Sequence, residues 1–395
     1  MKIVYLNHTG AISGAERSLL ELMAHLPPEV EPVLVSPEGP LHDAAKARGV
    51  AVQPVPWREA SLSVSPREAV TATAALVASG RHVARLARAT GAELIHANSI
   101  RAGVAAVVAS IGGPPAIVHL RDTLPPGPLT SAVMGTIALG ATSVIGNSHY
   151  TATAFSALSR RRRGVHAIYN PIDLKRFTPE GMDRSAIRER LGVAESALVL
   201  GVVGQITPWK GQDTAVRALG EVRARHPDAV LLIAGEAKFV GAAVRHDNAA
   251  YLERLRAMAS ASGLGDAVRF LGEREDVVDI FGALDVLLVP SWEEPFGRVV
   301  VEGMAMGLPV IATAKGGPAE IISDGVDGML ADPEELSGWA ERIERIAGDP
   351  ALRDRLARAA RERATAFGVH GHVAAVVGCY ERALATRPGL RRRWV

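Results

Sequence analysis

Residues 198–211 read LVLGVVGQITPWKG, and this stretch decides the fold. It begins with an apolar run, continues into a glycine-containing loop, and leads to a helical pattern from Gln212 to Arg225. A short run without polar residues predicts a strand that is buried on both faces, as in a parallel sheet. A helix directly after the loop offers backbone amides to a phosphate, and Lys210 adds a positive charge. Lys210 also fits a solvated turn, so this loop alone leaves both interpretations open.

Short β-branched runs alternate with helical patterns on both sides of this stretch. Such alternation is typical of βαβ units and predicts parallel sheets covered by helices on both faces. The expected strands are residues 2–6, 32–36, 51–55, 94–97, 117–120, 143–146 and 165–169 in the first half, and 198–203, 229–234, 268–271, 286–289 and 309–312 in the second. The predicted fold class is therefore α/β, with two Rossmann-like doubly wound domains facing each other across a cleft.

A domain boundary is expected between the two halves. Asn170-Pro171 ends the preceding strand, and Pro179–Gly181 supplies turn residues before a new helix. We expect an N-terminal domain at residues 1–185 and a C-terminal domain at residues 186–369. A final helix at about 370–395 is expected to pack back on the N-terminal domain.

Composition excludes several classes of protein. The chain has 395 residues, of which 48% are hydrophobic, so it can form a core and is not disordered. Its single cysteine, Cys379, excludes a disulfide framework and cysteine-rich metal sites. The initial MKIVYL is expected as a buried strand rather than a signal peptide, and no apolar window approaches the roughly 20 residues of a membrane span. We therefore expect a cytoplasmic protein.

Charge is unevenly distributed along the chain. The total of 44 Lys and Arg against 42 Asp and Glu gives a net charge of +2. Residues 1–185 carry +5, residues 186–386 carry −7, and the last nine residues carry +4. This asymmetry favours two domains with different partners, although random variation of surface charge explains it as well.

Two carboxylates frame the strongest motif, EPFGRVVVE at residues 294–302. It follows an expected strand and enters a helix near Arg298, so Glu294 lies in the loop and Glu302 about one turn inside the helix. Loop amides at Phe296 and Gly297 would point at a ligand bound at the helix N-terminus. A nucleotide-sugar suits this geometry, because the amides can bind phosphate and the carboxylates can accept hydroxyl groups. The alternative is that one carboxylate favours the helix dipole and the other is solvated.

A third loop of this kind, KGGPAE at residues 315–320, also follows an expected strand. Gly316 and Gly317 let the backbone approach a ligand closely, and Pro318 can open the next helix. A simple tight turn is the alternative. Three such loops in one predicted domain are much less expected by chance than any one of them.

Together these motifs resemble the retaining glycosyltransferases of family 4, which belong to the group 1 glycosyltransferases and have the GT-B fold. The resemblance extends to Ser13–Glu16 after the first strand, to Asn147-Ser148, and to Asn170–Asp173, so it covers nearly the whole chain. The C-terminal motifs are specific in combination, whereas the N-terminal ones are weak.

The resemblance implies a role for each matching residue. Glu294 would contact hydroxyls of a donor sugar, Glu302 the ribose of its nucleotide, and Lys210 the diphosphate. His119, in VHLRD at residues 118–122, would be the active-site histidine near the sugar. The implied catalytic residues are His119, Glu294 and Lys210, and the implied donor-binding residues are Gly14, Gly204, Gln205, Lys210, Arg274, Glu294, Phe296, Gly297, Glu302, Gly316 and Gly317.

One position departs from the family. Many relatives carry Arg directly after the glycine that matches Gly204, where this chain has Gln205. An amide supplies no charge to a pyrophosphate. Either Lys210 carries more of the stabilisation, or another basic residue such as Lys315 or Arg298 assists. The sequence contains no Asp-x-Asp, which predicts a metal-independent site with no cofactor besides the nucleotide-sugar substrate.

The implied reaction moves a sugar from a nucleoside diphosphate sugar to an acceptor hydroxyl with retention, in polysaccharide, glycolipid or natural-product biosynthesis. By the same resemblance the leaving phosphate helps to deprotonate the acceptor, and Glu294 positions the donor. Two alternatives stay open, namely a phosphorylase or epimerase on the same fold and a non-catalytic nucleotide-binding subunit that assists a partner enzyme. A nicotinamide dehydrogenase is disfavoured because no Gly-x-Gly-x-x-Gly follows the first strand.

The sequence does not identify the acceptor, which could be a glycan, a lipid-linked molecule or a small molecule. Residues 123–159 contain no charged side chain and end at four arginines, Arg160–Arg163. One interpretation is a peripheral contact of the N-terminal domain with the inner membrane face. The other is a buried helical unit followed by a solvated basic turn. Nucleic acid is not expected as a partner, because the total charge is balanced and no binding module is present.

Overall fold

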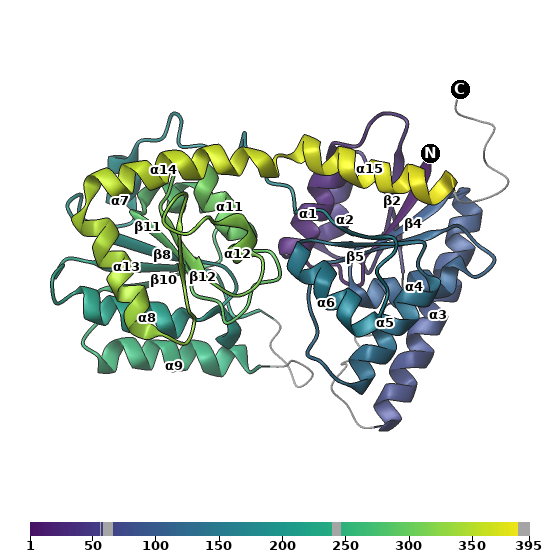
Figure 1. The fold of residues 1–395 in the computed structure, drawn as a ribbon, viewed down its shortest axis with the longest axis horizontal. Helices are drawn as coiled ribbons and strands as arrows, with labels where there is room; N and C mark the ends of the chain where they lie inside the picture. Colours follow the sequence, from purple (N-terminus) through teal and green to yellow (C-terminus); the bar gives the residue numbers. More distant parts are fainter. Residues whose placement is uncertain (56, 58–65, 239–245, 386–395) are drawn as a thin grey trace. The chain divides into compact units, whose positions relative to one another are not determined.

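The computed structural model describes residues 1–55, 57, 66–238 and 246–385 (Figure 1). The chain divides into two compact units. Met1–Pro171 and Val369–Val395 form the first unit, and Ile172–Gly368 forms the second. Each unit is built around its own parallel sheet with helices on both faces.

The first unit holds a seven-stranded sheet with the strand order β3-β2-β1-β4-β5-β6-β7, in which every pairing is parallel. Its elements are β1 (Lys2–Leu6), α1 (Gly14–Ala24), β2 (Glu31–Ser36), α2 (Pro40–Lys46), β3 (Ala51–Pro54), α3 (Pro66–Thr90), β4 (Leu94–Ala97), α4 (Ile100–Ser110), β5 (Ala116–Leu120), α5 (Pro128–Gly140), β6 (Ser143–Gly146), α6 (His149–Ser159), β7 (Val165–Ala167) and α15 (Val369–Ala385).

Alternation along the strands divides the core of this unit into two layers. Val4 and Leu6 of β1 face the layer that α3, α4, α5 and α6 cover, and Ile3 and Tyr5 face the layer that α1, α2 and α15 cover. Because both faces are buried, the strands are apolar at almost every position. The last helix, α15, therefore belongs to the core of the first unit, although residues 386–395 of the expected helix lie outside the described part of the chain.

The second unit holds a six-stranded parallel sheet with the order β10-β9-β8-β11-β12-β13. Its elements are α7 (Arg184–Arg190), β8 (Val199–Val203), the 3-10 helix η1 (Pro208–Lys210), α8 (Gln212–Val222), β9 (Val230–Ala234), α9 (Asn248–Ala261), β10 (Val268–Gly272), α10 (Val277–Ala283), β11 (Val286–Val289), α11 (Arg298–Ala305), β12 (Val310–Thr313), α12 (Pro318–Ile321), β13 (Met329–Ala331), α13 (Leu336–Gly348), α14 (Pro350–Ala364) and the 3-10 helix η2 (Thr365–Phe367).

The observed boundary differs from the expected one at residues 185/186. Residues 172–185 belong to the second unit, because their contacts are made there. The Ile172 amide donates to the carbonyl of Phe367 at 2.9 Å, and the Phe177 ring packs edge-on against Phe281 at 6.0 Å. Asn170-Pro171 thus ends the first unit directly, without a linker that extends to the next helix.

The predicted α/β class with two Rossmann-like parallel sheets is confirmed. Every expected strand is present, with bounds shifted by no more than two residues. The sequence prediction missed β13, a three-residue strand at the edge of the second sheet that pairs only with β12. Its sequence, Met-Leu-Ala, contains none of the β-branched residues that favour a strand. Of the helices in the described ranges, none combines the length and apolar character that a membrane crossing requires.

Tyr380 tests how α15 is anchored to the first unit. Its ring is fully buried, and its hydroxyl donates to the Tyr5 hydroxyl at 3.2 Å and contacts His96 Nδ1 at 2.8 Å. Tyr380→Ala should lower the free energy of unfolding by about 3 kcal/mol, because it removes a buried ring and leaves a cavity. Urea unfolding measures this change. Glu381→Ala, at the exposed neighbouring position, should stay within about 0.5 kcal/mol of the original protein, and equal effects of both variants would contradict the packing.

Candidate functional site

The carboxyl ends of β8 and β11 meet where the strand order of the second sheet reverses. From β8 the chain builds outward through β9 and β10, and it then returns to begin β11 on the other side of β8. Such a reversal opens a crevice outside the carboxyl ends of parallel strands, where ligands bind in folds of this class. The loops at 204–211 and 290–297, which hold two of the predicted motifs, both start at this point.

Lys210 and Glu294 form an ion pair across these two loops. Lys210 Nζ lies 2.6 Å from Glu294 Oε2, and both side chains are mostly buried. The same carboxylate oxygen accepts a hydrogen bond at 3.0 Å from the hydroxyl of Ser291, which is fully buried. The ammonium also lies 4.2 Å from the centroid of the Trp209 ring. The Glu294 carboxylate is therefore fixed by two donors from different segments.

The third predicted loop is tied to the backbone of Glu294. The amide of Gly317 donates to the Glu294 carbonyl at 2.7 Å, and the Glu294 amide donates to the Lys315 carbonyl at 3.4 Å. Gly316 has φ +89°, and a Cβ at this position would lie 2.2 Å from the Glu294 carbonyl oxygen. A Cβ at Gly317 would lie 2.4 Å from the Cα of Phe296. Glycine at both positions is thus required by the close approach of two backbones.

The N-terminus of α11 joins this arrangement. Gly297, with φ +94°, is the residue before the helix, whose first amides have no partner within the helix. The buried Phe296 ring packs 6.0 Å from Phe367, which fixes the turn. Arg298 Nη2 lies 3.2 Å from Glu302 Oε1, and both side chains are about 90% buried. Glu302 therefore points into the unit beside a guanidinium and is not solvated.

Gln205 does not replace the missing cation. Its Nε2 donates to the carbonyl of Lys238 at 3.3 Å, so the amide is engaged with the segment after β9. The backbone of Gly204 is held to the end of β9, since its amide donates to the Ala234 carbonyl at 2.9 Å. Of the two basic residues considered as substitutes, Lys315 is exposed and forms an ion pair with Glu334 at 2.7 Å, and Arg298 is paired with Glu302. Lys210 is the cation that directly contacts Glu294.

Arg274 lies in the loop after β10, with its guanidinium bound to Asp276 at 2.6 and 2.8 Å. This side chain is exposed at the edge of the arrangement, two strands away from β8 in the sheet. The Asp276 carboxylate at that distance raises the pKa of Arg274 further above its ordinary value, so the guanidinium stays charged. The ion pair of Arg274 lies within one segment, residues 274–276, so it does not tie the loop after β10 to the loops that hold Lys210 and Glu294.

The remaining two candidates, Gly14 and His119, belong to the first unit. Gly14 is the first residue of α1, where Ser13 and Glu16 form a capping box. His119 belongs to β5 and is fully buried, with its ring centroid 5.4 Å from that of His96 on β4 and 6.0 Å from that of His372 on α15. Burial, together with the nearby charge of Arg121, holds the pKa of His119 well below its ordinary value. Its imidazole has no exposed surface in this unit, so a role beside a sugar stays a prediction.

Sequence reasoning missed a polar network along the carboxyl edge of the first sheet. Asn98 after β4 donates to Asn7 Oδ1 after β1 at 3.1 Å, and it accepts from Arg121 Nε after β5 at 2.9 Å. Asn7 donates to Glu16 Oε1 at 3.1 Å, and Asn147 after β6 donates to the Arg121 carbonyl at 2.9 Å. The available signal was one polar residue directly after each of four apolar strands.

The arrangement in the second unit places an ammonium, two carboxylates and a helix N-terminus at one sheet edge. The ammonium and amides suit an anionic ligand such as a phosphate, and the carboxylates suit hydroxyl groups. Within the described residues, no three His, Cys, Asp or Glu side chains are grouped as metal ligands would be. The sequence prediction also missed Ser291, three residues before Glu294, whose hydroxyl donates to the Glu294 carboxylate.

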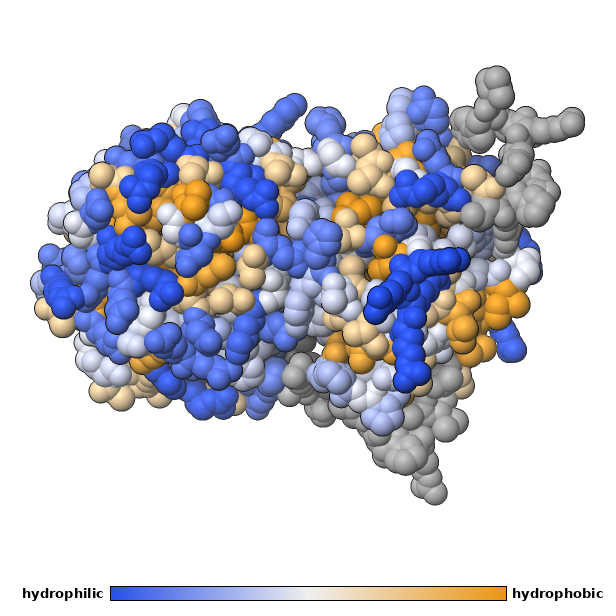
Figure 2. Space-filling model, viewed as in Figure 1, coloured by the Kyte–Doolittle hydropathy of each residue, from blue (hydrophilic) through white to orange (hydrophobic). Residues whose placement is uncertain are grey.

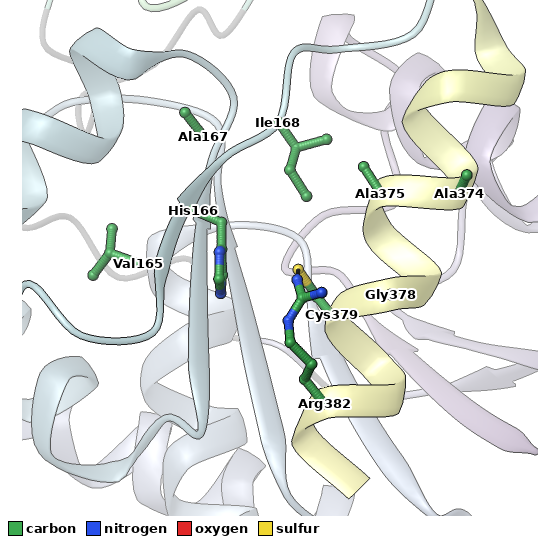
Figure 3. Close-up of a pocket in the computed structure, with 9 residues that line it drawn as sticks. All are labelled: Val165, His166, Ala167, Ile168, Ala374, Ala375, Gly378, Cys379 and Arg382. Carbon is green, nitrogen blue, oxygen red and sulfur yellow. Dashed lines mark hydrogen bonds between the residues drawn. The ribbon is translucent and has the colours of Figure 1, made fainter. Parts of the chain in front are cut away.

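A pocket of about 490 Å³ lies elsewhere, between β7 and α15 (Figure 3). Small side chains of α15 line one wall, and His166 and Arg382 bring polar groups. Arg382 Nη2 donates to Cys379 Sγ at 3.1 Å, but burial raises the pKa of the thiol, so the reactive thiolate is disfavoured. None of the candidate residues lines this pocket, so it is separate from the arrangement around Glu294.

Two family models match the chain. The model described as glycosyl transferases group 1 matches residues 183–363, and the model described as glycosyltransferase family 4 matches residues 12–176. The chain is 36% identical over 228 residues to the D-inositol 3-phosphate glycosyltransferase of Stackebrandtia nassauensis, which covers 56% of this chain and 49% of the relative. The Nocardioides sp. protein of the same name is 34% identical, with the same coverage. The chain thus spans about half the length of these curated relatives.

Solved structures match over nearly the whole chain. Anabaena Alr3699/HepE in complex with UDP-glucose has a TM-score of 0.82 at 28% identity, covering 97% of this chain and all of the other. The complex of the same protein with UDP has a TM-score of 0.83 at 27% identity. The sucrose-phosphate synthase of Thermosynechococcus elongatus, with a TM-score of 0.78 at 22% identity and 98% coverage of this chain, shares the fold.

Gly316 tests the close approach that holds the loops together. Gly316→Ala should lower the free energy of unfolding by about 2 kcal/mol more than Gly325→Ala. Both glycines have a positive φ, but a Cβ at Gly325 meets nothing within 4 Å, so the difference isolates the clash with Glu294. Urea unfolding of the two variants measures it. Equal destabilisation would show that the 314–317 loop can move away from Glu294.

Proposed function

The chain belongs to the group 1, family 4 glycosyltransferases with the GT-B fold, and on this premise we propose that it transfers a sugar from a nucleoside diphosphate sugar to an acceptor hydroxyl. The second unit holds the donor, and the first unit receives the acceptor. The observation that carries this proposal is the pairing of Lys210 with Glu294 at the switch point of the second sheet. Support comes from Alr3699/HepE, which binds UDP and UDP-glucose.

Lys210 resolves an electrostatic conflict in this site. A carboxylate beside a diphosphate would repel it, but the ammonium neutralises Glu294 and has three N–H donors, of which Glu294 takes one. The others are directed to the phosphate oxygens. As the bond between sugar and phosphate breaks, negative charge grows on the leaving diphosphate, and a fixed cation and fixed amides stabilise it without reorganisation. No metal ion is required in this proposal.

Glu294 positions the sugar, and Glu302 positions the ribose. Ser291 and Lys210 hold the Glu294 carboxylate, so its second oxygen is oriented to accept a sugar hydroxyl. Arg298 holds Glu302 in the same way within the first turns of α11. In the proposed transfer, the bond from the anomeric carbon to the diphosphate breaks while the acceptor oxygen forms a bond to that carbon on the same face, and the acceptor proton passes to an oxygen of the leaving phosphate. Attack on the same face retains the configuration of the sugar.

The acceptor is proposed to carry a negative charge. By units, the first holds 20 basic against 11 acidic residues and the second 24 against 31, so the net charges are +9 and −7. A basic acceptor unit favours an anionic acceptor. The relatives named D-inositol 3-phosphate glycosyltransferase support a polyol phosphate of this class.

Turnover experiments separate this proposal from its alternatives. A phosphorylase or epimerase would consume the donor with phosphate alone or with no second substrate. A non-catalytic subunit would bind the nucleotide-sugar without consuming it. A screen of UDP-, GDP- and TDP-sugars by thermal shift, followed by turnover with D-inositol 3-phosphate and other polyols, distinguishes the three. Absence of stabilisation by every donor would overturn the donor assignment.

Lys210→Ala and Glu294→Ala test the central ion pair. Each should lower kcat by about 100-fold, because one removes the charge at the leaving group and the other the orientation of the sugar. Steady-state kinetics with the donor found in the screen measures the effect. Lys175→Ala removes an exposed lysine of the same unit and should leave turnover unchanged. Full activity of either site variant would refute its assigned role.

We further propose that the first unit rests on an anionic membrane at the cytoplasmic face. Leu139 near the end of α5 is 92% exposed, and Ile111 after α4 is 75% exposed. Arg161 Nη1 binds the carbonyls of Ala138 and Ala141 at 2.6 Å, which brings the basic turn Arg160–Arg163 to the end of α5. Figure 2 shows hydrophobic and strongly hydrophilic side chains next to one another on this unit. Apolar insertion combined with basic side chains is the pattern of peripheral membrane contact.

Sedimentation with vesicles tests this contact. Arg162→Glu should weaken binding to phosphatidylglycerol-containing vesicles about fivefold or more, since each basic residue near an anionic surface contributes about 1 kcal/mol. Leu139→Glu should weaken it as well, because it removes the exposed apolar side chain. Val326→Glu, at an exposed apolar position of the second unit, is the control. Binding that is absent in the original protein, or equal in all variants, would reject the membrane contact.

A further inference from the structure

Trp292 is an exposed aromatic side chain inside a rigid loop. In the sequence it stands between the fully buried Ser291 and the ion-paired Glu294, yet the residue is 49% exposed. Among the large hydrophobic side chains that are exposed in the described chain, Trp292 is the single aromatic one. An indole offers a large apolar area that proteins usually bury, so an exposed indole in the loop of the proposed donor site can supply binding area to a ligand.

The backbone around Trp292 leaves its position little freedom. Its amide donates to the carbonyl of Trp209 at 2.8 Å, which ties it to the loop after β8. Two residues later, the backbone of Glu294 is bound to Lys315 and Gly317 on the loop after β12. The indole is thus presented from a segment that is fastened on both sides. A preorganised aromatic side chain binds a ligand with little loss of conformational entropy.

Among the described residues, the aromatic rings near this indole do not stack on its face. The ring of Trp209 is engaged by the Lys210 ammonium. His246 meets Trp292 edge to face, with ring centroids 6.2 Å apart and planes at 90°. This geometry orients the indole without stacking on it. In contrast to a protein-docking patch, which gathers several exposed apolar side chains, the described part of the second unit exposes one other large hydrophobic residue, Val326.

We propose that Trp292 is a stacking platform for the ring of a sugar or cyclitol. One face of such a ring presents C–H groups with partial positive charge, and the face of an indole carries negative potential. The hydroxyl groups around the ring edge can meet Glu294, two residues away in the same loop. This inference rests on the proposed function, and it assigns to Trp292 a part in recognising one of the two ring-bearing substrates. The donor sugar and the acceptor ring share this chemistry.

Trp292→Leu and Trp292→Phe test the platform. Leu keeps an apolar side chain without a π face, whereas Phe keeps the face. Calorimetry compares the donor identified by turnover with the same nucleoside diphosphate lacking the sugar, and kinetics gives the KM of D-inositol 3-phosphate. Trp292→Leu should weaken binding of the relevant ring about fivefold, and Trp292→Phe should recover most of this loss. Val326→Ala, the exposed apolar control, should change neither quantity.

The pattern of losses identifies the ring. If Trp292→Leu removes the extra affinity of the donor over its nucleoside diphosphate, the donor sugar stacks on Trp292. If donor binding is unchanged and the KM of D-inositol 3-phosphate rises about fivefold, the acceptor ring stacks on Trp292. Unchanged values for both, with normal turnover, overturn the platform and leave the proposed function intact. Absence of turnover and donor binding in the original protein would reject both.

Discussion

The parallel pairing of β8 with β11 is the constraint on which the proposed site depends. Leu200 and Gly201 of β8 align with Val286 and Leu287 of β11, so both strands end at the same edge of the sheet. The two segments are far apart in the sequence, and the pairing alone brings the loops after them together. Because the strand order reverses at β8 and β11, a crevice is expected outside this edge. In this register the two loops bring Lys210 within 2.6 Å of Glu294.

Local charge decides the electrostatics of the second unit. Its net charge of −7 would repel a diphosphate at long range. At moderate salt, however, interactions between exposed charges more than about 10 Å apart are largely screened. Over the few ångströms of a bound ligand, the partly buried ammonium and the amides at α11 dominate. Within the described residues, several carboxylates of this unit form ion pairs with arginine or lysine, as Glu302 does with Arg298 and Asp285 with Arg188. The net charge of the first unit, +9, has the sign that favours an anionic acceptor or lipid in the proposed function.

The fold was predictable because strand and helix signals alternate in this sequence. Continuous apolar runs marked the buried strands, and β13 escaped because its three residues, Met-Leu-Ala, include none that is β-branched. The boundary was placed too late, since Ile172 and Phe177 look like linker residues until their partners Phe367 and Phe281 are known. Contacts between residues so distant in sequence leave no local pattern.

Some residues of the candidate site could also be predicted from the local sequence, whereas others depend on distant contacts. Lys210, Glu294, Gly316 and Gly317 were predictable as residues that follow strands, and the structure brings them together. Ser291 was missed because a serine after a strand normally indicates a turn, and its bond to Glu294 depends on burial. For His119 the local sequence placed the residue near the end of a strand, but it could not reveal that α15, more than 200 residues later, covers it. Side-chain burial by a distant helix is a tertiary property.

The substitution at Gln205 makes the site depend on one pair of charges. The side chain of Gln205 is uncharged, and its amide donates to the backbone carbonyl of Lys238, so this position supplies no cation for a diphosphate. In the proposed function, Lys210 would neutralise Glu294 and contact the phosphate at the same time. Such a lysine would link donor binding to the proposed sugar-positioning residue, because movement of either anion would change the geometry of the other. The uncharged backbone amides of α11 and of the 314–317 loop would supply the part of the phosphate binding that does not depend on this ion pair. Gly316 and Gly317 approach Glu294 closely, and backbone hydrogen bonds join Glu294 to their loop. These contacts fix the position of the Glu294 backbone relative to the amides of that loop.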